Sequence, residues 1–196
     1  AAGSDVAAFA VAVRCSIVVG LVHSAAASVY GPQMAAAYDR SDLEPLRQLV
    51  TRVGLIISFL TWPILLLMLL IAPELMGVFG EDYSSEYQLL RVLLLGQLVA
   101  GCLGHVGHVL AMTGHDGAAR ANSLVPVLIL IGGLSILVPS LGGVGAAAAA
   151  AAAASGGHAA SVIFVRRVVG FWPLFRSRSE VVDALGAVRG LKVQRG

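Results

Sequence analysis

The chain has 196 residues, of which 58% are hydrophobic and only 12% are charged, and its mean hydropathy is +0.87. Soluble domains carry about 25% charged residues, so this composition excludes an ordinary soluble domain and indicates an integral membrane protein. The formal net charge of +2 argues against a nucleic-acid partner. Cys15 and Cys102 fall inside apolar runs without a CxxC motif, and we interpret them as packing residues.

The first apolar segment covers about residues 6–29 and predicts a membrane-spanning helix that ends before Gly31-Pro32. A polar loop follows at residues 38–52. Within it, Ser41 to Glu44 fits a capping box, with the serine as N-cap and the glutamate three residues later. The helical spacing of the apolar residues that follow predicts a short amphipathic helix leading into the next span.

The second apolar segment, residues 53–72, reads VGLIISFLTWPILLLMLLIA and contains no charge. A helix of this length extends ~30 Å, which is the thickness of the hydrocarbon core of a bilayer. Pro63 lies at its middle. Membrane helices tolerate such a proline because neighbouring groups satisfy the freed carbonyl, so we predict one continuous span.

Three further apolar segments follow in the rest of the chain. An acidic loop at residues 73–86 precedes the third span, and the tight loop Thr113–Gly117 precedes the fourth, which is expected to end at Pro139. The fifth is built on the alanine run Ala146–Ala154, which we interpret as a closely packed helix. The sequence thus predicts an all-α integral membrane protein with a transmembrane bundle over residues 1–170, comprising five spans at about 6–29, 53–72, 87–112, 121–138 and 144–165, and a basic tail over residues 171–196.

Basic residues alternate between the loops. The first and third loops and the tail carry them, whereas the second and fourth loops carry none, so the positive-inside rule puts the C-terminus in the cytoplasm and the N-terminus outside. No signal peptide precedes the first span, so we expect further spans upstream of Ala1. In the tail, apolar residues at helical spacing from Val181 to Val188 predict a short helix lying on the anionic inner leaflet. The basic residues that set this orientation are Arg40, Arg47, Arg52, Arg120, Arg166, Arg167, Arg176, Arg178, Arg189, Lys192 and Arg195.

Five ionisable side chains within the predicted spans are candidates for function, because charges at membrane depth are costly and usually face a bundle interior or a water-filled cavity. Arg14 lies about eight residues, or ~12 Å, into the first span, and Arg91 lies near the outer end of the third. Either arginine would bind an anionic substrate or extend its side chain to the interface. His23, His105 and His108 belong to the inner half of the bundle.

The histidines are expected to form hydrogen bonds between helices, with a proton relay as the alternative. His105 and His108, three residues apart, are expected to share one helix face. Two such histidines would need further ligands to hold a metal, and we predict no metal site and no cofactor. No catalytic motif is present in the sequence, so we do not expect an enzyme.

Several short motifs, in this order, resemble the C-terminal half of polysaccharide (O-antigen-type) flippases of the multidrug/oligosaccharidyl-lipid/polysaccharide transporter superfamily. The resemblance covers about residues 5–170 and depends on the order and spacing of the motifs. They are Phe9–Arg14, Pro32, Asp42-Leu43 with Leu46, Ala72-Pro73, Phe79-Gly80 with Tyr83, Leu89–Arg91, Gly96-Gln97, Thr113-Gly114, Pro139 and Gly142–Ala146.

The resemblance implies an all-helical transporter of two lobes with 12–14 spans, of which this chain would supply five from the second lobe. Such flippases move undecaprenyl-diphosphate-linked oligosaccharide across the bacterial inner membrane by alternating access, for the synthesis of lipopolysaccharide and other polysaccharides. The implied partners are the lipid-linked oligosaccharide, the bilayer and an N-terminal lobe. Of the arginines that line the cavity in this family, Arg14 and Arg91 are the positions that carry over.

Three other functions remain open. A multidrug exporter of the same fold would favour carboxylates within its spans to couple cations, and the predicted spans contain none. A membrane enzyme of polysaccharide assembly would need a large outer loop, whereas the two predicted outer loops are short. A membrane scaffold without transport activity is the third.

Overall fold

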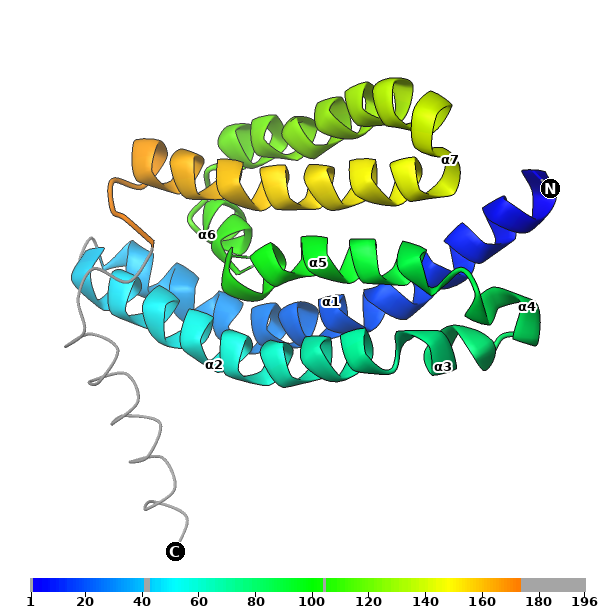
Figure 1. The fold of residues 1–196 in the computed structure, drawn as a ribbon. Helices are drawn as coiled ribbons and strands as arrows, with labels where there is room; N and C mark the ends of the chain where they lie inside the picture. Colours follow the sequence, from blue (N-terminus) through cyan, green and yellow to red (C-terminus); the bar gives the residue numbers. More distant parts are fainter. Residues whose placement is uncertain (1, 41–42, 104, 174–196) are drawn as a thin grey trace, which may run out of the picture.

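A computed structural model of the chain describes residues 2–40, 43–103 and 105–173, with side chains from residue 6 onward. Every regular element in this part is an α-helix, which confirms the all-α expectation. Among the described residues, three helices are long and apolar enough to cross a membrane, or four spans result when a bent pair of helices counts as one. The chain is therefore a helical bundle with the character of a multi-pass membrane protein (Figure 1). The predicted tail helix lies outside the described residues.

Helix α1 (Ala2–Asp39) runs through Gly31 and Pro32, so the expectation that the helix ends before them is wrong. Pro32 is exposed, so its ring faces away from the neighbouring helices. Gly31 is buried, and an ideal Cβ there would lie 3.1 Å from Met112 Sδ. Gly31 thus serves close packing between helices rather than termination.

Helix α2 (Leu43–Leu70) unites the expected short amphipathic helix and the second span in one element, so the predicted loop at 38–52 shrinks to a few residues. The reason is one buried stripe at helical spacing that crosses the expected boundary and includes Leu46, Val50, Val53 and Ile57.

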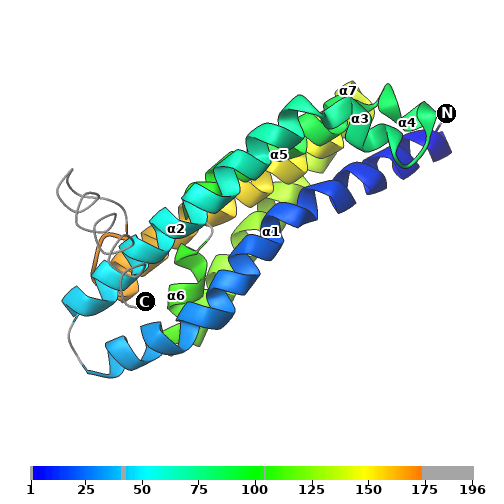
Figure 2. The same ribbon diagram turned by 90° about the horizontal axis from the view of Figure 1, so that it is seen from below.

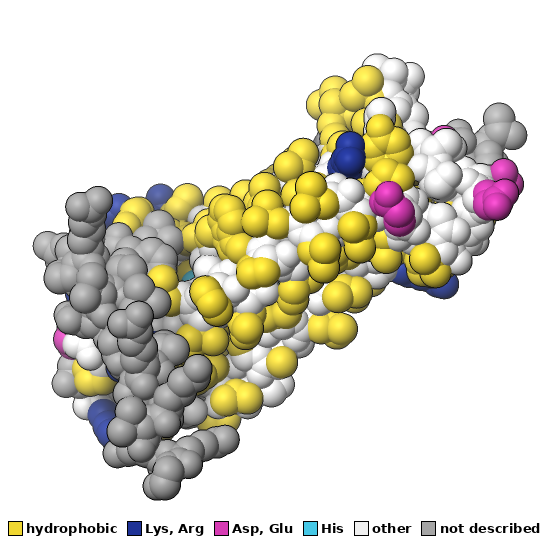
Figure 3. Space-filling model, turned by 60° about the horizontal axis from the view of Figure 1, so that its bottom comes forward, with side chains coloured by type: hydrophobic (Ala, Val, Ile, Leu, Met, Phe, Trp, Pro, Cys, Tyr) yellow, Lys and Arg dark blue, Asp and Glu magenta, His cyan; other side chains and the backbone are white. Residues whose placement is uncertain are grey.

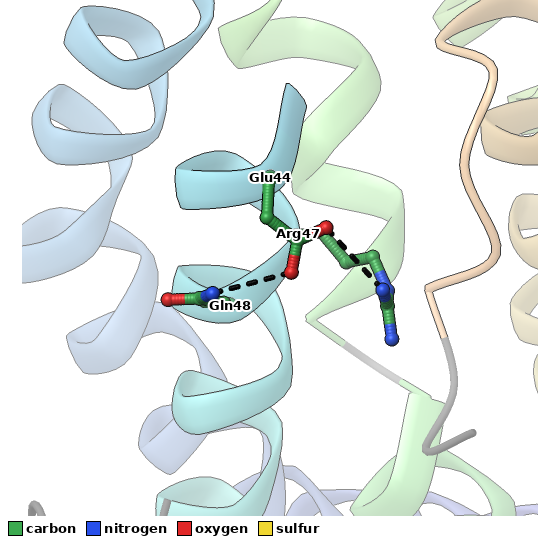
Figure 4. Close-up of polar contacts among 3 residues, drawn as sticks. All are labelled: Glu44, Arg47 and Gln48. Carbon is green, nitrogen blue, oxygen red and sulfur yellow. Dashed lines mark hydrogen bonds and ion pairs between the residues drawn. The ribbon is translucent and has the colours of Figure 1, made fainter. Parts of the chain in front are cut away.

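The polar end of α2 carries a local network around the Glu44 carboxylate (Figure 4). Arg47 Nη1 donates to Oε2 at 3.4 Å, and Gln48 Nε2 donates to Oε1 at 3.2 Å. Such exposed pairs stabilise a helix only slightly. The serine of the expected capping box lies outside the described residues.

The expected acidic loop contains two short helices, α3 (Ala72–Gly77) and α4 (Glu81–Ser84). Gly80 joins them with φ +145°, a backbone conformation that side chains disfavour. The acidic residues of this segment lie at the end of the bundle opposite the start of α2 (Figure 2).

The third span is broken, not continuous as predicted. Helix α5 (Tyr87–Leu103) and helix α6 (Val106–Met112) meet at an angle of 52°. Gly101 lies in the last turn of α5, just before the break, and glycine lowers the stability of a helix. The backbone carbonyls of this turn accept hydrogen bonds from side chains of other helices.

Helix α7 (Asp116–Val168) has 53 residues and contains a sharp reversal at Gly142, where φ is 55° and ψ is −131°. Its two arms, residues 116–141 and 143–168, lie antiparallel (Figure 1). Close approaches between the arms occur in reverse order along them. Pro139 lies within the first arm, so the expectation that it ends the fourth span is wrong. The chain reverses at Gly142 instead, because glycine is the residue type that tolerates this backbone conformation. The approaching pairs are Gly133 with Ala149, Gly156 with Ile129, Gly157 with Pro126, and Asn122 with Ser161.

The buried apolar side chains form two separate clusters along the bundle. One lies toward α3 and includes Ala12, Leu65 and Leu94; the other lies toward the start of α2 and includes Leu46 and Leu110. Hydrophobic side chains also cover the middle of the outer face, with charged side chains mainly toward the two ends (Figure 3). An apolar exterior over an apolar interior is the pattern of a bundle surrounded by lipid.

Candidate functional site

Polar side chains occupy the level of the bundle between the two apolar clusters. His23 on α1 and Thr61 on α2 are buried there, and His105 at the start of α6 is buried just beyond them, against Gly54 within the second cluster. The break between α5 and α6 lies at this level. A broken helix at membrane depth needs partners for its freed backbone groups, and in transporters such breaks mark binding sites.

Two side chains from other helices bond to the end of α5. His23 Nε2 donates to the carbonyl oxygen of Ala100 at 2.8 Å, and Ser58 Oγ donates to that of Gly101 at 2.9 Å. The last carbonyls of a helix have no partner within it, so these bonds compensate for the break. They also tie α1 and α2 to α5.

The hydrogen bonds of His23 indicate its tautomer. A carbonyl oxygen only accepts, so the nitrogen facing Ala100 carries the proton. The other nitrogen, Nδ1, lies 3.3 Å from the carbonyl oxygen of Val19, and a second donation there would require an imidazolium. The shorter bond therefore assigns a proton to Nε2, and the ring acts as a bridge between α1 and α5.

His105 is only 4% exposed, and neither of its ring nitrogens has a hydrogen-bond partner among the described residues. Its ring lies against Gly54 of α2, where an ideal Cβ would come within 2.6 Å of Cε1. His108 points elsewhere, into a cavity beside α7. The two rings, expected on one face, thus have different neighbours, because His105 precedes α6 and only His108 lies within it.

The cavity lies between α6 and the two arms of α7 and has a volume of about 350 Å³. Its polar lining comes from three segments that are distant in the sequence. Two glycines in its lining leave little room for a side chain. An ideal Cβ on Gly107 would lie 3.2 Å from Ser161 Oγ, and one on Gly157 would lie 3.2 Å from Pro126 Cβ. The polar side chains are His108 from α6, Asn122 and Ser123 from the first arm, and His158 and Ser161 from the second.

Asn122 links the two arms of α7 at the cavity wall. Its Nδ2 donates to Ser161 Oγ at 3.0 Å, and that hydroxyl donates in turn to the carbonyl oxygen of Gly157 at 3.0 Å. Asn122 Oδ1 is buried and has no partner among the described residues. A buried acceptor without a partner costs free energy, which offsets part of the gain from the bond that Asn122 donates to Ser161.

Our sequence reasoning missed four of these residues: Asn122, Ser123, His158 and Ser161. His158 carried a readable signal, since it is an ionisable side chain inside the predicted fifth span. It lines the same cavity as His108. Among the described residues, no three histidine, cysteine or acidic side chains form a group that would hold a metal ion.

The two arginine candidates lie outside this cavity. Arg14 is exposed on a stripe of α1 that also presents Ile17 and Leu21, and it has no charged partner among the described residues. Arg91 is half-buried, with its guanidinium carbon 4.6 Å from the centre of the Tyr87 ring. That geometry is a cation–π contact within one helix turn.

The chain matches no family model, and neither the curated proteins nor the solved structures include one significantly similar to it.

Proposed function

We propose that this chain is a part of a flippase that moves undecaprenyl-diphosphate-linked oligosaccharide across the bacterial inner membrane by alternating access. The chain would contribute five spans to the second lobe of a two-lobe transporter with 12–14 spans. The proposal starts from the motif resemblance and is supported by the arrangement of helices and of charge. In this role the protein needs no catalytic residue and no cofactor.

The geometry of α5, α6 and α7 supports the count of five spans. The two arms of α7 lie antiparallel, and each has about 25 residues, enough to cross the hydrocarbon core. The bent pair α5–α6 counts as one broken crossing, and α1 and α2 supply one each. Broken helices near mid-membrane are a recurring feature of secondary transporters.

The distribution of charge supports the proposed orientation. Arg40, Arg120 and Arg166 lie at the ends of α1 and α7 that meet at one end of the bundle, and Arg52 lies in the third turn of α2, which begins at that end. The segment 73–86 at the opposite end carries acidic residues and no basic ones. The positive-inside rule then favours a cytoplasmic position for the end of α7.

The observation that carries the substrate class is the position of Arg14. A charged side chain exposed on an apolar helix face, with no charged partner among the described residues, is costly unless it meets an anion, water or another part of the protein. A guanidinium can donate two parallel hydrogen bonds to a diphosphate. The described carboxylates lie near helix ends rather than at mid-bundle, which favours an anionic substrate over the cation coupling of a drug exporter.

The test is replacement of Arg14 at the native locus. We expect Arg14→Ala to abolish surface polysaccharide, and Arg14→Lys to leave partial activity, because lysine keeps the charge but loses the bidentate geometry. Arg120→Ala is the matched control, since Arg120 is also exposed but lies at the end of the bundle. Polysaccharide and membrane protein level are measured together. Normal polysaccharide from Arg14→Ala at normal abundance would refute the assignment.

A further inference from the structure

The chain leaves the end of α7 in a turn that packs back against the bundle. Gly170 has a φ of +93°, and its N–H donates to the carbonyl oxygen of Val165 at 3.2 Å, which closes the end of the helix. The next residue, Phe171, is only 8% exposed and belongs to the second apolar cluster together with Leu46 of α2. Packing therefore holds this turn in place, and the residue that follows it has a defined position.

That residue, Trp172, lies against an arginine from the last turn of α7. The guanidinium carbon of Arg166 is 4.5 Å from the centre of the indole ring, a cation–π distance. Trp172 is 42% exposed, and Arg166 and Arg167 are both exposed. Neither arginine forms an ion pair with a residue that the structure describes. Two adjacent guanidinium groups thus lie at one place on the surface without an acidic group to neutralise them.

The neighbouring side chains place this group at the boundary between hydrocarbon and water. Ile163, one helix turn before the arginines, is 50% exposed, and Val168 is 39% exposed. The end of α7 lies at the same end of the bundle as the polar start of α2 (Figure 1). Tryptophan is enriched at membrane interfaces, where its ring lies at the level of the headgroups. Arginine near the end of a membrane helix reaches the same level with its charged group.

A lipid phosphate is the anion that occurs at this level. A guanidinium donates two parallel hydrogen bonds to a phosphate, and the indole ring restrains Arg166, so less side-chain freedom is lost on binding. The carbonyl end of α7 carries partial negative charge and opposes an anion, so the arginines must supply the attraction. A phosphatidylcholine headgroup would also bring its cationic choline close to two guanidinium groups. A phospholipid with net negative charge avoids this repulsion.

We propose that Arg166, Arg167 and Trp172 form a binding site for the phosphate headgroup of an anionic phospholipid. The two guanidinium groups donate to the phosphate, and the indole ring lies beside the glycerol region of the same lipid. The site requires only that the chain crosses a bilayer, so it does not rest on the flippase assignment.

The test uses the fluorescence of the full chain in lipid nanodiscs. The sequence contains two tryptophans, so Trp62→Phe leaves Trp172 as the only indole. Phosphatidylglycerol or phosphatidylcholine with brominated acyl chains is added at the same low share to unlabelled phosphatidylcholine, and quenching reports which lipid lies beside the ring. Two arginines at about 1 kcal/mol each would give about 25-fold stronger association of phosphatidylglycerol. We expect about tenfold, because the end of the helix opposes the anion.

Three variants on this background assign the preference to the arginines. Arg167→Gln leaves the stacked pair intact and should reduce the preference about fivefold, the factor for one arginine. The double variant Arg166→Gln/Arg167→Gln should abolish the preference. Arg120→Gln is the matched control, because it removes the same charge from an exposed position at the same end of the bundle and should keep the preference.

Two measurements guard against a change in folding. Quenching of Trp172 by brominated phosphatidylcholine should be the same in every variant, because the ring remains at the boundary. In Trp172→Phe, the remaining indole is that of Trp62, which is 40% exposed within α2. Its fluorescence should be quenched equally by the two lipids.

Several results would overturn the proposal. They are equal quenching of Trp172 by both lipids in the Trp62→Phe protein, an unchanged preference in the double variant, or the same preference at Trp62. A larger loss of preference in sodium phosphate than in sodium chloride of equal ionic strength would assign the arginines to a free anion and reject the lipid. Normal polysaccharide from Arg14→Ala would reject the flippase and leave this lipid site intact.

Discussion

The contact between Gly54 and His105 predicts a strong penalty for a single added methyl group. An ideal Cβ on Gly54 would lie 2.6 Å from Cε1 and 2.7 Å from Nε2 of the histidine ring. Ordinary contacts begin near 3.4 Å, so the ring would have to move by about 0.8 Å. His105 is 4% exposed, so packed neighbours restrict such a movement. Overpacking of this kind costs about 1–3 kcal/mol.

Two opposing effects must be separated in Gly54→Ala. Alanine stabilises a helix by about 1 kcal/mol relative to glycine, which partly offsets the clash. Gly20→Ala in α1 provides the baseline, because an ideal Cβ there would meet no other described side chain or helix within 4 Å and the same helix gain applies. The difference in free energy of unfolding between the two variants, about 1–3 kcal/mol, then isolates the clash. A titration with SDS in mixed micelles, followed by circular dichroism, measures it.

Removal of the ring completes the test. In a His105→Ala background, Gly54→Ala should be as stabilising as Gly20→Ala, because the methyl group would then occupy vacated space. The double-mutant cycle should therefore give a coupling of about 1–3 kcal/mol. If Gly54→Ala and Gly20→Ala stabilise the parent protein equally, the packing of α2 against the start of α6 is not as described.

Three further predictions concern the reversal, the helix break and the orientation. Gly142→Ala should destabilise the protein by about 1–3 kcal/mol, because a side chain is strained at that backbone conformation, whereas Gly132→Ala should not. Equal free energies of unfolding for the two variants would contradict the reversal at Gly142. Ser58→Ala should cost about 1 kcal/mol by leaving the Gly101 carbonyl unpaired, and no loss in the SDS titration would mean that another group satisfies it. In a cysteine-free background, Ser85→Cys should react with an impermeant maleimide in intact cells, and Arg40→Cys only after lysis; the opposite pattern would invert the orientation.

The boundaries of the helices show where sequence reasoning is weakest. Pro32 and Pro139 were expected to end helices, yet both lie inside them. Proline removes one backbone donor, and at an exposed helix position in lipid this loss is tolerated more readily than a chain break, which would free several groups. A glycine with positive φ, not a proline, reverses the chain between the arms of α7.

The break between α5 and α6 could not be predicted from the local sequence. A continuous helix over residues 87–112 satisfies its own hydrogen bonds, so nothing in the segment itself requires a break. The break is compatible with the membrane because His23 and Ser58, from two other helices, bond to the freed carbonyls. Those partners come into reach only in the folded bundle.

The sequence by itself determined the solvent and the class of fold. Uncharged apolar runs of membrane length admit only helices, because every backbone group in lipid must find a partner, and the same reasoning singled out His23, His105 and His108 as residues at membrane depth. The tertiary structure decided which of them meet. The reversal of α7 brings Asn122 beside Ser161, 39 residues away, and places His158 in the lining of the same cavity as His108. Such a site depends on contacts between helices, and helix periodicity carries no information on which faces pair.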